Sequence, residues 1–164
     1  MTALLRPMTE QEYLAFYEYS RSQHIKDLMN ERGMTCDEAR RETERELAEL
    51  MPDGPTAPDN HVMAVEDGTD HRVVGYLWYI YEWYDDTRQV FVCDFGICEP
   101  VRRKGYAAAA LGEMEKRAGA DGCEESVLFV DNDNEPAQRL YARCGYARLK
   151  DAAHGRYLKK KLGS

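Results

Sequence analysis

The strongest signal for the fold lies in RQVFVCDFGICEPVRRKGYAAAALG, residues 88–112. Its first part, Val90–Cys98, is rich in β-forming residues, whereas Tyr106–Leu111 is rich in alanine. These compositions predict a strand followed by a helix, with residues 102–107 spanning the start of the helix. The strand and the helix are joined by a basic turn that contains one glycine.

This basic turn has the features of an anion site. The first turn of a helix presents unpaired backbone N–H groups and the positive end of the helix dipole, and Gly105 lets a phosphate approach the backbone closely. Positive charges next to this end of the dipole are unfavourable, and the turn contains three of them, on Arg102, Arg103 and Lys104. An ordinary basic cap is the alternative, but three cations at a helix start favour a bound anion.

Two motifs carry a resemblance to a known family. Arg102-x-x-Gly105-x-Ala107 resembles the Q/R-x-x-G-x-G/A signature of the GCN5-related N-acetyltransferase (GNAT) superfamily, which holds the pyrophosphate of acetyl-coenzyme A (acetyl-CoA). Residues 134–146, NEPAQRLYARCGY, resemble the family segment N-x-x-A-x-x-L-Y-x-x-x-G-F, with tyrosine replacing the final phenylalanine. The resemblance covers residues 60–162, and DFGICEPVRRKGYA is most similar to small bacterial acetyltransferases without a settled substrate.

The resemblance implies a set of residues that hold acetyl-CoA, the acetyl donor. In the family, the fourth strand binds the pantetheine arm, and a bulge there aims a backbone N–H group at the thioester oxygen. The matching positions are Phe95, Gly96, Ile97 and Cys98 for the arm, Arg102, Arg103, Lys104, Gly105, Tyr106 and Ala107 for the pyrophosphate, and Asn134 and Ala137 on the second motif. A glycine inside a strand, such as Gly96, marks a bulge, a close backbone approach or relieved packing. Asn134 also suits an N-cap.

Tyr141 is the expected general acid. A phenol with a reference pKa of about 10 is protonated at neutral pH and can donate to a thiolate whose conjugate acid has a pKa near 8.5. Taken alone, a helical tyrosine is more often a core residue, and the motif around Tyr141 reverses that preference.

Asp94 is the candidate base or amine anchor. It lies between Cys93 and Phe95 on the predicted strand, where a carboxylate is unusual. The alternative is a structural carboxylate that holds a neighbouring turn. The positions that some relatives use for a base are Phe91 and Phe129 here, and phenylalanine cannot act as a base.

Length and composition indicate one globular domain, residues 1–164, with 43% hydrophobic residues. The resemblance implies that residues 1–60 supply an N-terminal strand and the acceptor-side helices, and that residues 61–164 form the acetyl-CoA-binding core. No basic segment precedes a long apolar run, so we expect a cytoplasmic protein without a membrane span. Five scattered cysteines and four histidines lack metal-ligand spacing, so neither a disulfide framework nor a metal site is expected.

The net charge of −8 is distributed unevenly. Residues 1–60 and 61–100 each carry a net −6, whereas residues 101–164 carry +4. The basic part contains both motifs and suits a polyanionic donor. The acidic part favours a cationic amine acceptor, although a solvated acidic surface explains the N-terminal share equally well. The pI near 5.1 means that the protein is negatively charged at neutral pH, and a negative charge opposes binding to nucleic-acid phosphates.

Capping signatures, periodicity and turn residues place the other elements. We expect helices over residues 10–30, 35–51, 104–120 and 134–143, and strands over residues 4–8, 61–66, 73–83, 90–98, 126–130 and 154–162, with a further short strand at 146–149. Residues 20–24 weaken the first helical pattern and indicate a break. Residues 52–60, PDGPTAPDN, form a loop that we interpret as a lid.

This element order predicts a mixed α/β (α+β) fold. The resemblance makes it the GNAT fold, a mostly antiparallel sheet whose fourth and fifth strands are parallel and splay apart. It implies direct acetyl transfer to a primary amine of a small molecule, peptide or protein, by an enzyme whose relatives are often homodimers. One alternative is a non-catalytic acyl-CoA sensor of the same fold. A mononucleotide-binding protein is disfavoured because G-K-[ST] and G-x-G-x-x-G are absent.

Overall fold

The computed structural model describes residues 1–51, 54 and 56–163, and the chain divides into two compact units. The first unit contains Met1–Pro7 and the chain from Asp59 onward, and the second is Met8–Pro58. A single domain therefore stays a prediction. Part of the expected loop at 52–60 lies outside the described residues, and the lid interpretation falls there.

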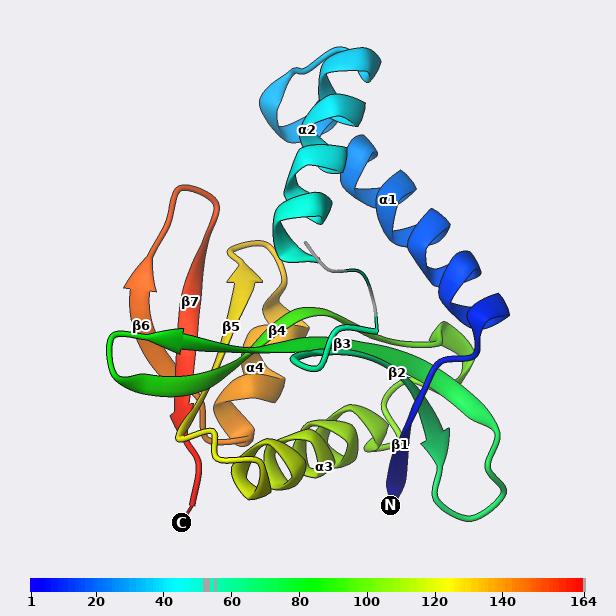
Figure 1. Ribbon diagram of the computed structural model, residues 1–164, viewed down its shortest axis with the longest axis vertical. Coiled ribbons are helices and arrows are strands. Elements are labelled where there is room, and N and C mark those ends of the chain that lie inside the picture. The colour runs from blue at the N-terminus through cyan, green and yellow to red at the C-terminus, as the bar shows by residue number, and fades with distance from the viewer. Residues whose placement is uncertain (52–53, 55, 164) are drawn as a thin grey trace. The chain divides into compact units, whose positions relative to one another are not determined.

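A seven-stranded sheet forms the centre of the first unit (Figure 1). Its strands are β1 (Ala3–Pro7), β2 (Asn60–Asp67), β3 (Val73–Tyr84), β4 (Thr87–Ile97), β5 (Glu125–Asp131), β6 (Ala147–Asp151) and β7 (Gly155–Lys161). They are ordered β1-β2-β3-β4-β5-β7-β6, and every neighbouring pair is antiparallel except β4 and β5. This arrangement confirms the predicted mixed α/β fold with parallel fourth and fifth strands.

Two helices and a short 3-10 turn complete this unit. The turn η1 (Glu99–Val101) leads into α3 (Tyr106–Ala120), and α4 (Glu135–Arg143) follows β5. The helix α3 packs against one face of the sheet, where Leu77, Val90, Leu111 and Met114 are fully buried. Their apolar side chains form the core that holds the helix in place.

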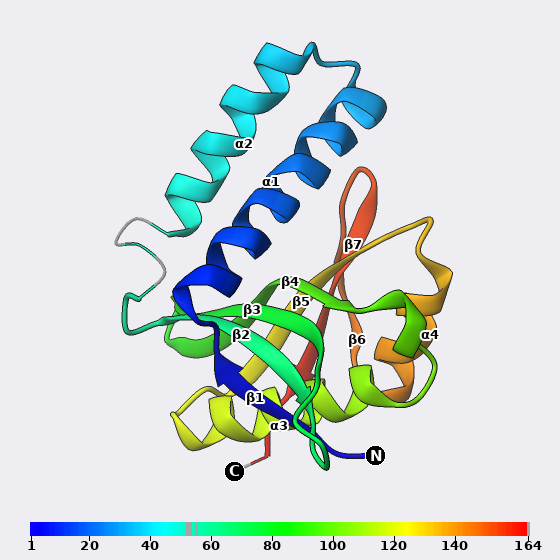
Figure 2. The same ribbon diagram turned by 90° about the vertical axis from the view of Figure 1, so that its right-hand side faces the viewer.

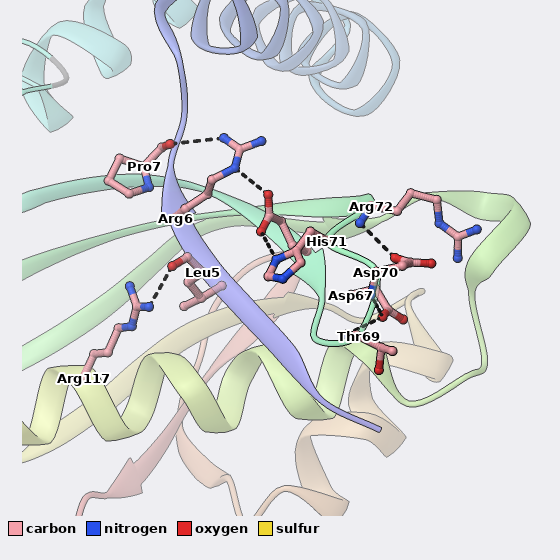
Figure 3. Close-up of polar contacts among 10 residues, drawn as sticks. Leu5, Arg6, Pro7, Asp67, Thr69, Asp70, His71, Arg72 and Arg117 are labelled. Carbon is pink, nitrogen blue, oxygen red and sulfur yellow. Dashed lines mark hydrogen bonds and ion pairs between the residues drawn. The ribbon is translucent and has the colours of Figure 1, made fainter.

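Polar contacts also join α3 to the edge of the sheet (Figure 3). Arg117 on α3 donates from Nη2 to the Leu5 carbonyl oxygen on β1 at 2.7 Å. Beside it, Arg6 Nε lies 2.6 Å from Glu66 Oε2 and so links β1 to β2. These contacts fix the C-terminal part of α3 to β1, and β1 to β2.

Asp67 forms the turn that follows β2. The Asp67 side chain accepts hydrogen bonds from the backbone N–H groups of Thr69 and Asp70, at 2.7 and 3.1 Å (Figure 3). A carboxylate that bonds to backbone groups two and three residues ahead is a typical turn-former. This turn places β3 next to β2 in antiparallel register.

The second unit is a pair of helices, α1 (Glu10–Arg32) and α2 (Cys36–Leu50), which lie side by side and antiparallel (Figure 2). Both begin with the predicted capping boxes, in which Thr9 and Thr35 accept bonds from the backbone three residues ahead. Between the helices, Gly33 adopts φ 64°, as expected for a helix C-terminus.

The predicted break in the first helix is wrong, because α1 is continuous through residues 20–24. Side chains of α2 support this polar stretch. Arg21 Nη2 lies 2.9 Å from Glu44 Oε1, and His24 Nε2 lies 2.6 Å from Glu46 Oε2. Among the residues that the structure describes, no helix is long and apolar enough to cross a membrane.

Candidate active site

The site begins where β4 leaves its parallel neighbour. Pairing between β4 and β5 runs from Gln89–Glu125 to Val92–Leu128 and ends there. Beyond that point β4 pairs with β3 as far as Ile97, while β5 pairs with β7 as far as Asp131. The two strands diverge in this region (Figure 1).

The bulge in β4 lies at Cys93. Of the three roles that the sequence left open for Gly96, the bulge is therefore excluded. Trp78 on β3 pairs with Asp94 and Tyr79 pairs with Val92, so Cys93 is the extra residue. A bulge bends its strand and increases the twist. Because it falls immediately after the last parallel pair, it accounts for the divergence of β4 from β5.

Gly96 has a packing role. It pairs with Tyr76 on β3, and a Cβ atom at Gly96 would lie 2.8 Å from the Tyr76 ring. From this position the Tyr76 hydroxyl donates to Asp94 Oδ1 at 3.3 Å. Asp94 and Tyr76 lie on the sheet face opposite α3, because both alternate with core-facing neighbours.

Tyr76 is the site residue that sequence reasoning missed. The only signal available was an aromatic residue that covers a glycine on the next strand, and this signal requires the strand register.

The turn before α3 has the geometry of an anion cradle. Arg103 and Gly105 adopt left-handed backbone angles, φ 64° and 91°, and no side chain caps α3. For this reason the helix starts at Tyr106 and not at Lys104 as expected. The Arg102 Nε atom donates to the Ile97 carbonyl oxygen at 2.8 Å, which fixes the turn to the end of β4.

The residues of this turn fit a phosphate group. Arg103, Lys104 and Gly105 are exposed, and a Cβ atom at Gly105 would occupy space that the backbone leaves open, with Met1 Cβ 3.4 Å away. Backbone N–H groups at an uncapped helix start bind anions well. The cations beside them add charge that an anion would neutralise.

The Tyr106 side chain serves the structure and leaves only its backbone to the cradle. Its hydroxyl donates to Asp67 Oδ2 at 2.5 Å, and the residue is buried. This bond, followed by the backbone bonds from Thr69 and Asp70, lowers the pKa of Asp67 to about 2. Tyr106 therefore joins the first residue of α3 to the turn after β2.

The second motif forms α4 as predicted. The Asn134 side chain accepts from the Ala137 backbone N–H group at 3.2 Å, which confirms the N-cap role. Tyr141 is buried on the same helix. Burial first, and then Cys144 and Asp94, raise the pKa of Tyr141 to about 12.

The cysteines offer little nucleophilic chemistry. Burial raises the pKa of Cys93, Cys123 and Cys144, so these groups stay as thiols. Cys98 is exposed beside η1, at the end of the segment expected to bind the pantetheine arm. Within the described part of the chain, no cluster of three or more His, Cys, Asp or Glu residues could hold a metal ion.

Comparisons with known proteins agree with this architecture. Residues 13–146 match the model of the Acetyltransferase (GNAT) family. The chain is 27% identical over 146 residues to the uncharacterised N-acetyltransferase YycN of Bacillus subtilis, covering 89% of this chain and 93% of YycN. It is 30% identical over 147 residues to YdgE of the same organism, covering 90% and 93% of the two chains.

Solved structures show the same fold. The crystal structure of the putative acetyltransferase YycN from Bacillus subtilis has a TM-score of 0.81 at 26% identity, covering 93% of this chain and 96% of YycN. The spermidine N-acetyltransferase of Vibrio cholerae, solved with CoA and spermine, has a TM-score of 0.67 at 15% identity, covering 98% and 96%. This chain belongs to the GNAT acetyltransferase family. The predicted enzyme class, N-acetyltransferase, is therefore confirmed.

Proposed function

We propose that this enzyme transfers an acetyl group from acetyl-CoA directly to a primary amine. The observation that carries the proposal is the uncapped, basic start of α3, which follows directly on the segment of β4 that has left β5. The start of α3 suits the pyrophosphate, and the end of β4 suits the extended pantetheine arm. A bound acetyl-CoA would supply the acetyl group as a thioester.

The chain would hold this donor mainly through its backbone. The first-turn N–H groups of α3, from Tyr106 to Ala107, and the side chains of Arg103 and Lys104 would bind the pyrophosphate. Residues 95–98 would hold the pantetheine arm along the β4 edge that β5 no longer covers. Asn134 would contact the donor at the start of α4 while its side chain caps that helix.

Tyr141 would stabilise the departing thiolate. A pKa of about 12 keeps its phenol protonated at neutral pH. Complete proton transfer to a thiolate with a reference pKa near 8.5 is unfavourable from so weak an acid. The phenol therefore acts chiefly by donating a hydrogen bond to the charge that develops on sulfur. We expect Tyr141→Phe to slow turnover about tenfold, the value of one such bond.

Asp94 would orient or deprotonate the amine. A lysine-type amine has a reference pKa of about 10.4 and must lose a proton before it attacks. The Asp94 carboxylate is partly buried and lies where β4 departs from β5, and the Tyr76 hydroxyl orients it. Its electrostatic effect on Tyr141 supports a position near the reacting groups.

The acceptor would be cationic. Residues 61–100 carry a net charge of −6, and Asp85 and Asp86 are exposed at the tip between β3 and β4. Such a surface raises the local concentration of positively charged substrates. A spermidine N-acetyltransferase of Vibrio cholerae has the same fold, which makes polyamines the first acceptors to test.

Calorimetric titration with acetyl-CoA and with a pantetheine fragment that lacks the pyrophosphate tests the donor site. Gly105→Asp places a carboxylate in the cradle, and Gly122→Asp is the matched control. Gly122 has φ 95° and open space around a Cβ atom. Gly122→Asp therefore introduces the same charge and a similar backbone strain away from the start of α3. Release of free thiol with a panel of amines then measures transfer.

We expect wild type and Gly122→Asp to bind acetyl-CoA with micromolar affinity and the fragment much more weakly. Gly105→Asp should lose acetyl-CoA binding by about tenfold or more. Equal binding by both variants would refute the cradle. Binding without turnover over the whole amine panel would instead favour the acyl-CoA sensor.

A further inference from the structure

Hydrogen bonds connect four polar side chains into a series: those of Glu115, Ser126, Tyr146 and Lys160. The Tyr146 hydroxyl donates to Glu115 Oε2 at 3.0 Å and lies 2.7 Å from Ser126 Oγ, while Lys160 Nζ donates to Glu115 Oε1 at 2.7 Å. A phenol carries one hydrogen, so Ser126 must be the donor to the Tyr146 oxygen. The series joins α3, β5 and β7 to Tyr146, which lies between α4 and β6.

This series lies in the interior. Ser126 is fully buried, Tyr146 is 6% exposed, and the Glu115 side chain is 12% exposed. A buried polar network stabilises one arrangement only if each member has its partners. The three hydrogen bonds satisfy this condition, and they fix the Tyr146 ring relative to three separate elements.

Tyr146 in turn contacts Tyr141 in two ways. Its backbone N–H group donates to the Tyr141 carbonyl oxygen at 2.9 Å. The two rings pack edge to face, with centroids 5.9 Å apart and an interplanar angle of 62°. The Tyr146 ring is thus a wall against which the Tyr141 ring rests. A rotation of one ring would displace the other, because both are buried.

We propose that Tyr146 is a positioning residue, whose hydroxyl bonds to Ser126 and Glu115 hold the Tyr141 ring in its reactive orientation. The inference rests on the proposed function of Tyr141. A phenylalanine, the residue in the family motif, would fill the same volume but would lose both hydroxyl bonds. The hydroxyl therefore adds orientation and is not required for packing.

Tyr146→Phe removes one oxygen atom and is the direct test. At saturating acetyl-CoA and amine, we expect kcat to fall by about fivefold to tenfold, on the scale of one lost orienting hydrogen bond. The KM for acetyl-CoA should stay within about twofold of wild type, because the donor-binding residues are untouched. Ser126→Ala removes the other end of the same bond and should lower kcat in the same direction.

Tyr81→Phe is the matched control for stability. Tyr81 on β3 is 7% exposed, and its hydroxyl donates to Asp121 Oδ2 at 2.7 Å. This variant loses a buried tyrosine–carboxylate bond of the same kind, outside the surroundings of Tyr141. We expect Tyr81→Phe and Tyr146→Phe to lower the melting temperature similarly, while only Tyr146→Phe lowers kcat.

A double-variant cycle separates positioning from general damage. In the Tyr141→Phe background, Tyr146→Phe should change kcat by less than about twofold, since there is no phenol left to orient. An unchanged kcat in both Tyr146→Phe and Ser126→Ala, or effects that multiply fully with Tyr141→Phe, would overturn the inference. A fully active Tyr141→Phe would refute the role of Tyr141, and the inference with it.

Discussion

The described helices of this protein begin in two different ways. The starts of α1, α2 and α4 are capped by Thr9, Thr35 and Asn134, and each has acidic residues in its first turn. The start of α3 has neither a side-chain cap nor an acid, and Gly105 precedes it in a left-handed conformation. A side-chain cap contributes about 1 kcal/mol, so α3 forgoes stability that the other helices keep.

Under the proposed function, this difference leaves the first backbone N–H groups of α3 available to the pyrophosphate of acetyl-CoA. A capping side chain would occupy the same N–H groups that a phosphate needs. The cations beside α3 also oppose the helix dipole, whereas the acids of the other three helices complement it. Removal of the cations beside the start of α3 should therefore raise stability and weaken donor binding.

The largest expected effect comes from Arg103→Gln combined with Lys104→Gln. Loss of two charge-assisted contacts should weaken acetyl-CoA binding by about a hundredfold, while relief of the unfavourable dipole interaction should raise stability by about 0.5 kcal/mol. Titration calorimetry and thermal unfolding measure the two effects. Arg40→Gln with Arg41→Gln, exposed on α2, is the charge-matched control and should leave binding unchanged. A parallel loss of stability and affinity would contradict the comparison.

Asn134 caps α4 and is also proposed to contact the donor, so its substitution should affect both stability and binding. The expected loss of affinity is smaller than for the two cations. Asn134→Ala should cost about 1 kcal/mol of stability, whereas Asn134→Ser keeps a capping oxygen and should cost little. Both variants lose the amide, so both should bind acetyl-CoA a few-fold more weakly if Asn134 contacts the donor. Thermal unfolding and titration of the same samples separate the two roles. Unchanged affinity in both variants would leave Asn134 as a cap only.

Tyr106→Phe tests what holds the start of α3 in place of a cap. Removing the hydroxyl should raise the pKa of Asp67 from about 2 toward 3.8, but not fully, because the bonds from Thr69 and Asp70 remain. The stability linked to a lowered carboxyl pKa is present above its unfolded value and is lost as the pH falls through the folded value. The variant should therefore lose it at a higher pH than wild type does. Carboxyl NMR titration measures the shift, and an unchanged Asp67 pKa would refute the link.

The smallest expected effect is on the pH dependence of kcat and concerns Tyr141, which is buried on α4. Because burial raises the pKa of Tyr141 to about 12, its ionisation should not lower kcat between about pH 7 and about pH 10. A tyrosine of ordinary pKa would be half ionised at the upper limit. A fall in kcat near pH 10 that disappears in Tyr141→Phe would contradict this assignment. Rate profiles of wild type and variant provide the measurement.

Local signals made most of the elements predictable. The capping boxes at Thr9 and Thr35 and the Asn134 cap lie within four residues of the groups they bind, so the sequence contains the whole interaction. The start of α3 was misplaced by two residues, because alanine-rich composition does not report the left-handed angles of Arg103 and Gly105. The continuity of α1 was missed because its support comes from α2.

The element order, the basic turn before α3 and, through two motifs, the family could all be predicted from the sequence. These features depend on neighbouring residues or on short patterns. Only the tertiary structure decided the bulge at Cys93, the Tyr76–Asp94 contact over Gly96 and the network around Tyr146. Each depends on strand register or on helix packing between residues far apart in the chain. A shift of one residue in register would turn these side chains to the other face of the sheet.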